Sequence, residues 1–63
     1  MKNRIDVTWK RGGKELQLRA TYNEQTDTWR IEIRQNRSDE FSYIDTTANV
    51  WRCFEELGSI YLP

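Results

Sequence analysis

Strict alternation of apolar and polar residues is the feature that most constrains how this chain can fold. Three apolar series repeat at every second residue: Ile5, Val7 and Trp9; Leu16, Leu18, Ala20 and Tyr22; Trp29, Ile31 and Ile33. Successive side chains of a strand point to opposite faces, so a period of two is typical of a strand with one buried face. We therefore expect three half-buried strands, over about residues 4–10, 15–22 and 28–35.

The first two strands are separated by Gly12-Gly13, which predicts a tight hairpin turn. Two glycines accept the positive φ angles that both central positions of a type I′ turn require. A two-residue turn at this point sets the strand register. It pairs apolar residues with apolar residues and opposite charges with each other: Ile5–Ala20, Val7–Leu18, Trp9–Leu16, Asp6–Arg19 and Lys10–Glu15. This agreement on both faces supports the register.

A four-residue turn over residues 24–27 joins the second and third predicted strands. It gives the pairs Tyr22–Trp29, Ala20–Ile31, Leu18–Ile33 and Arg19–Glu32. On the polar face, Asp6, Arg19 and Glu32 then form a row of alternating charge, and we expect Arg19 to pair with Glu32. If Arg34 pairs with Glu40 in a fourth strand over about residues 40–44, Phe41 and Tyr43 fall on the apolar face.

The alternation ends after Ile44, where the sequence becomes typical of an amphipathic helix over about residues 46–57. Asp45, Thr46 and Thr47 are candidate N-cap residues, and Gly58 is a candidate C′ residue. The helical period places Val50, Cys53, Phe54 and Leu57 on one stripe, with Trp51 at its border. The chain is thus predicted to be one small α+β domain, residues 1–63, with a short tail over residues 58–63. Its fold is an antiparallel meander of three or four strands with one C-terminal helix packed on one face.

Composition argues against an enzyme and against a bound cofactor or metal. The chain has no histidine, the commonest general base, and only one cysteine, Cys53. A single thiol forms no internal disulfide, and without histidine it provides no structural zinc site. Cys53 falls on the apolar stripe of the helix, which indicates an inert structural thiol. The segment MKNRIDVTW lacks the apolar core of a signal peptide, and no apolar run is long enough to span a bilayer, so we expect a soluble, cytoplasmic protein.

Charge distribution leaves nucleic-acid binding open as an alternative function. Ten basic and ten acidic residues give no net charge, but residues 1–37 hold nine basic and five acidic residues. The segment KRGGK would place Arg11 and Lys14 at a hairpin tip, and Arg30 and Arg34 would point outward from the third strand. These four are the candidate nucleic-acid contacts. The favoured interpretation is that they are charges that solvate a turn and a sheet face.

Part of the third strand resembles a known DNA-binding family. Trp29, Glu32, Ile33 and Arg34 match the Trp-x-x-Glu-Ile-Arg strand of plant ethylene-response-factor DNA-binding domains. The resemblance implies a three-stranded sheet whose outward face, rich in Arg and Trp, enters the major groove. This chain departs from that pattern, because its tryptophans share the apolar parity and its outward face balances positive and negative charge.

The C-terminal residues provide the candidate protein interface. Trp51 at the border of the stripe, with Ile60, Tyr61 and Leu62 beyond Gly58, could form an exposed apolar patch. Such patches mark interfaces, and Trp and Tyr are favoured anchors. The alternative is that the tail folds back and completes the core. The leading prediction is a small non-enzymatic interaction module, such as a regulator or inhibitor, that binds a protein partner or self-associates through an open sheet edge.

Overall fold

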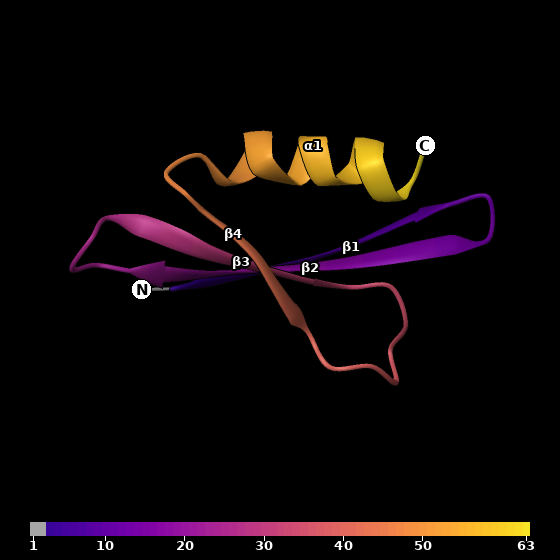
Figure 1. The fold of residues 1–63 in the computed structure, drawn as a ribbon, viewed down its shortest axis with the longest axis horizontal. Coiled ribbons are helices and arrows are strands. Elements are labelled where there is room, and N and C mark those ends of the chain that lie inside the picture. The colour runs from indigo at the N-terminus through magenta and orange to yellow at the C-terminus, as the bar shows by residue number, and fades with distance from the viewer. Residues whose placement is uncertain (1–2) are drawn as a thin grey trace.

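The computed structural model describes residues 3–63 and contains four strands and one helix. The elements are β1 (Arg4–Arg11), β2 (Lys14–Asn23), β3 (Thr28–Arg34), β4 (Ser42–Thr47) and α1 (Val50–Tyr61). The strands form one antiparallel sheet in the order β1-β2-β3-β4. Helix α1 lies along one face of this sheet, and the loop between β3 and β4 extends on the other side (Figure 1). The predicted α+β meander with a C-terminal helix is confirmed.

The first two hairpins have the register that their turn chemistry predicts. Gly12 and Gly13 have φ angles of 55° and 80°, as a type I′ turn requires. Every pair predicted between β1 and β2 and between β2 and β3 is present. The second turn spans residues 24–27, and Asp27 adopts a φ of 54° there, a left-handed conformation that Asp tolerates better than most residues.

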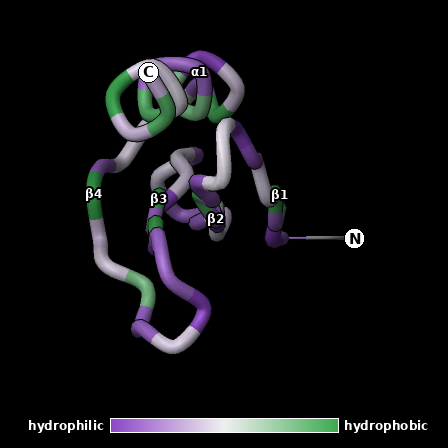
Figure 2. Tube along the Cα trace, turned by 90° about the vertical axis from the view of Figure 1, so that its right-hand side faces the viewer, coloured by the Kyte–Doolittle hydropathy of each residue, from purple (hydrophilic) through white to green (hydrophobic). Residues whose placement is uncertain are grey.

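The core lies between α1 and the inner face of the sheet, and the end-on view in Figure 2 shows α1 stacked on one side of the strands. Its buried residues are Leu16, Leu18, Ala20, Ile31, Ile33, Val50, Cys53, Phe54, Leu57 and Leu62. Phe54 is fully buried at the centre, where Trp9 and Trp51 meet its ring edge to face, at centroid distances of 6.2 and 5.6 Å. Aromatic packing therefore ties the helix to the β1 side of the sheet.

The prediction for the fourth strand was wrong by one residue of register. Glu40 does not pair with Arg34. Instead Ser42 pairs with Ile33 and Tyr43 with Glu32. Because a one-residue slip moves each side chain to the other face, Phe41 and Tyr43 follow the outward parity rather than the apolar one. A bulge at Ile44 then brings Asp45 opposite Ile31.

The predicted start of the helix was also wrong, because β4 extends to Thr47 and includes all three candidate caps. Thr46 and Thr47 are β-branched and pair with Arg30 and Trp29 of β3. The N-cap is Asn49, whose side chain accepts a hydrogen bond from the backbone N–H of Arg52 at 3.3 Å. Strand pairing thus outweighed the local capping signal.

Gly58 lies inside α1 rather than beyond its end, so the predicted tail over residues 58–63 is mostly helical. The glycine is needed for close packing, since a Cβ there would come within 2.7 Å of the Trp9 ring. The helix continues to Tyr61, and the backbone N–H of Leu62 donates to the carbonyl of Gly58 at 2.8 Å. Leu62 turns back into the core.

Candidate functional site

The outward face of the sheet, opposite α1, carries arginines stacked on the two aromatic residues that the register slip placed there. The guanidinium of Arg19 lies 4.0 Å from the ring centroid of Phe41, and that of Arg34 lies 4.4 Å from it. Arg30 lies 4.4 Å from the centroid of Tyr43, whose hydroxyl is 2.8 Å from Thr46 Oγ1. Phe41 thus contacts two cations, while half of Tyr43 stays exposed.

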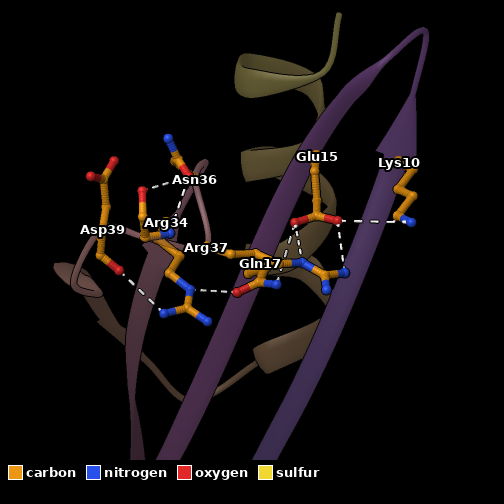
Figure 3. Close-up of polar contacts among 8 residues, drawn as sticks. Lys10, Glu15, Gln17, Arg34, Asn36, Arg37 and Asp39 are labelled. Carbon is orange, nitrogen blue, oxygen red and sulfur yellow. Dashed lines mark hydrogen bonds and ion pairs between the residues drawn. The ribbon is translucent and has the colours of Figure 1, made fainter.

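The β3–β4 loop is attached to the same face by a polar network centred on Glu15 (Figure 3). The Nε and Nη2 atoms of Arg37 donate to the two carboxylate oxygens of Glu15 at 3.0 and 3.1 Å. Hydrogen bonding from Arg37 lowers the pKa of Glu15 below its ordinary value. Arg34 donates to the Gln17 side chain and to the Asp39 carbonyl. These contacts hold the loop against β2.

The charge row across the sheet is only partly as predicted. Arg19 donates to Asp6 at 3.1 Å, and Arg4 donates to the same carboxylate at 2.8 Å. Partial burial raises the pKa of Asp6, but the hydrogen bonds from Arg19 and Arg4 outweigh it and lower the pKa overall. Arg19 and Glu32 are register partners, yet no ion pair joins them among residues 3–63. Asp6 and Phe41, rather than Glu32, determine the position of the Arg19 guanidinium.

The four candidate nucleic-acid residues do not share one surface. Arg30 and Arg34 lie on the outward face. Arg11 and Lys14 sit at the exposed tip of the first hairpin, with the parity of Trp9 and Leu16, which belong to the helix side. A ligand on the outward face would therefore meet one pair of arginines and not the basic tip.

The four candidate interface residues are also separated by the fold. Leu62 is only 6% exposed, and Tyr61 packs half-buried against the core. Trp51 and Ile60 are 56% and 66% exposed, but nine helical positions separate them, so they project from opposite sides of α1. Tyr61 follows Leu57 at helical spacing, so extending the apolar stripe past Gly58 would have predicted its burial.

A different apolar surface appears where α1 meets β1 at Trp9, and sequence reasoning missed it. Ile5, Val7 and Trp9 of β1 are only half-buried. Trp51 lies on the same side of α1 as Gly58, about two turns before it, and Gly58 packs against the Trp9 ring. We call these four side chains, Ile5, Val7, Trp9 and Trp51, the β1 margin.

A hollow of about 410 Å³ continues the β1 margin toward the hairpin tip. Its lining residues come from β1 and from the second half of α1: Trp9, Lys10, Arg11, Glu55, Gly58, Ser59 and Leu62. The hollow is open and combines a basic wall on β1 with Glu55 on the helix. Such a surface can hold a side chain of a docked protein, although it does not enclose a small molecule.

The structure places Cys53 in the core, where burial raises the pKa of its thiol, with Asp45 and Glu56 adding to the effect.

Within residues 3–63, no group of three or more His, Cys, Asp or Glu side chains is arranged to hold a metal ion. In the same part of the chain, α1 is the sole helix and is too short and too polar to cross a membrane.

No family model, curated protein or solved structure matches this chain. The resemblance of the β3 strand to ethylene-response-factor domains therefore rests on Trp29, Glu32, Ile33 and Arg34 alone. Of these, Trp29 and Ile33 face the core rather than the outward surface.

Proposed function

We propose that this chain is a small non-enzymatic module that binds a protein partner through the β1 margin. The observation that carries the proposal is the exposure of Trp51, 56%, beside an edge strand whose apolar side chains are only half-buried. A contiguous apolar surface with a tryptophan anchor is the usual centre of a protein interface. A reducing, cytoplasmic setting belongs to the proposal, because it suits a single buried thiol.

The outward face supports a protein partner less well, because its charges are already engaged within the chain. Arg37 is bound by Glu15, Arg19 by Asp6, and Arg34 by Gln17 and the Asp39 carbonyl. A partner would have to replace these contacts before it gained new ones. A partner that binds the side chains of the β1 margin breaks no such ion pairs or hydrogen bonds, since these side chains are apolar.

Two neighbouring glutamates on α1 allow a matched test by site-specific photo-crosslinking in the native host. Glu55 lines the hollow beside β1, whereas Glu56 points about 100° away around the helix and lines a different hollow with Asp45. We expect a crosslinker replacing Glu55 to capture a discrete protein, and one replacing Glu56 not to. Trp51→Ala should abolish the capture at position 55. Equal capture from both positions would contradict the proposal.

A second candidate function is supported by one observation, the placement of Phe41 and Tyr43 on the outward face among arginines. Bases of a single strand stack on aromatic rings of a sheet, and arginines neutralise the phosphates. This nucleic-acid binding would be strongly salt-dependent.

The test of this second function compares two arginines. On single-stranded nucleic acid, Arg30→Ala should flatten the slope of log affinity against log salt by about 0.7. Arg11→Ala should leave the slope unchanged, because Arg11 lies at the hairpin tip with the opposite parity. If neither single-stranded nor duplex nucleic acid is retarded at low salt, the outward face is not a nucleic-acid site.

A further inference from the structure

We propose that the β1 margin pairs with a second copy of this chain, through antiparallel β1–β1 contact across a two-fold axis at Thr8. This inference rests on the proposed function and names the partner. The β1–β1 pairing would join two four-stranded sheets into one continuous sheet, with both α1 helices on the same face.

Within residues 3–63, β1 pairs with β2 alone, so its outer edge has backbone groups available for such pairing. The N–H of Tyr22 donates to the carbonyl of Asn3 at 2.8 Å, which places the odd-numbered residues of β1 in the hydrogen-bonded pairs with β2. The N–H and C=O groups of the even-numbered residues therefore point away from β2. These are Arg4, Asp6, Thr8 and Lys10.

The two edges of the sheet differ in how they are protected. Edge strands of monomeric proteins are commonly kept short or interrupted by a bulge or proline. β4 fits that rule, because it has six residues and its register shifts at Ile44. β1 has eight residues, no proline and a continuous register with β2. The longer edge, which has neither bulge nor proline, is also the one that carries the half-buried apolar residues.

Charge complementarity selects the register of the β1–β1 pair. With Thr8 opposite Thr8 of the second copy, Asp6 faces Lys10 of the second copy, and the two-fold axis repeats this contact. On the helix side, Val7 then faces Trp9 of the second copy, which extends the apolar surface. Cross-strand pairs of opposite charge and of aromatic with β-branched residues are both favourable.

The neighbouring registers that keep the same faces together are less favourable. Centring the pair on Trp9 places Asp6 opposite Gly12 and Lys10 opposite Thr8 of the second copy, so this register forms no pair of opposite charges. Centring it on Val7 places Arg4 opposite Lys10 of the second copy, and centring it on Asp6 places the two Asp6 carboxylates together. Like charges directly opposite are destabilising. The Asp6–Lys10 contact adds to bonds within the chain: Asp6 already accepts hydrogen bonds from Arg4 and Arg19, and its carboxylate can accept a further donor. Lys10 can turn toward it, since its side chain is 71% exposed and its Nζ lies 3.9 Å from Glu15.

The experiment measures self-association by sedimentation velocity over a concentration series. The wild type should show a concentration-dependent dimer. Thr8→Pro should be monomeric yet folded, because the N–H it removes points to the open edge and proline is tolerated there. Thr8→Val, which keeps the N–H, should dimerise like the wild type. A wild type that stays monomeric at every concentration, or a folded Thr8→Pro variant that still dimerises, would overturn the inference.

Charge reversal tests the register itself. D6K alone and K10E alone should each weaken dimerisation by at least about tenfold, because both contacts across the axis become repulsive. An equimolar mixture of the two variants should recover dimers that contain one chain of each, since both contacts then join opposite charges. A mixture that dimerises as weakly as either variant alone would refute this register. If the wild type is monomeric but position 55 still crosslinks to a host protein, the self-pairing fails and the proposed function stands.

Discussion

The two faces of this sheet come from one alternating pattern but are held by different forces. On the inner face, Leu16, Leu18 and Ile31 are almost completely buried beneath α1. On the outward face, arginines cover Phe41 and Tyr43 and pair with carboxylates that stay in contact with water. Burying one large apolar side chain contributes about 1.5–3 kcal/mol, whereas an exposed ion pair contributes about 0.2–1 kcal/mol. The inner face therefore maintains the fold, and the outward face mainly selects the register in which the strands pair.

The largest expected effect is on the inner face. Phe54→Ala should lower the free energy of unfolding by about 3–5 kcal/mol, since it removes a fully buried ring. Trp51→Ala is the matched control, because Trp51 is also aromatic and contacts Phe54 but is mostly exposed. Its cost should be about 0.5–1.5 kcal/mol. Urea denaturation of both variants measures the difference, and equal losses would show that α1 is not anchored as described.

Gly58 tests how tightly α1 approaches β1. Gly58→Ala gains about 1 kcal/mol of helix propensity but forces a methyl group against the rigid Trp9 ring, at a cost of about 1–3 kcal/mol. We expect a net loss of stability. Combined with Trp9→Leu, the same Ala should become stabilising relative to Gly, because the ring that it would meet is gone. A stabilising Gly58→Ala in the wild-type background would contradict the close approach.

A smaller effect is expected from the outward aromatic residue. Phe41→Leu keeps apolar bulk at this position but removes the ring on which Arg19 and Arg34 stack. Each cation–π contact contributes about 0.5–1 kcal/mol at an exposed site, so the free energy of unfolding should fall by about 1–2 kcal/mol. NMR should show weakened contacts between β2 and the loop that precedes β4. An unchanged stability would mean that the stacking does not select the β4 register.

The smallest expected effect is the acid dependence of the outward face. The pKa values of Asp6 and Glu15 are lower in the folded chain than their ordinary values of about 4. Their contribution to stability is therefore complete above about pH 4–5 and is lost as the pH falls through the lower, folded values. Denaturant titrations of the wild type and of Glu15→Gln at pH 7 and at a pH below about 4 should show a difference in stability at pH 7 that shrinks at the lower pH. An equal difference at both values would show that Glu15 acts through packing rather than charge.

Local pattern and turn chemistry determined the first three strands and the placement of the helix on one face. A two-residue turn at Gly12-Gly13 leaves one register in which both apolar and charged pairs agree, and a period of two has only two possible orientations of its faces. The apolar stripe from Val50 to Leu57 requires a sheet face to cover it. These features could be read from the sequence because each depends on residues close together in the chain.

The register of β4, both ends of α1 and the candidate surfaces depended on contacts between distant residues. Phe41 lies on the outward face, stacked by Arg19 and Arg34, and this one-residue choice is not encoded near Phe41 itself. Glycine ends many helices. Here the Trp9 ring lies where a Cβ of residue 58 would be, and α1 continues past Gly58. Trp51 sits beside the open edge of β1 because α1 is anchored there by Phe54 and Trp9. Local propensities of about 1 kcal/mol are outweighed when tertiary packing buries large side chains, and for that reason only the tertiary structure decided these features.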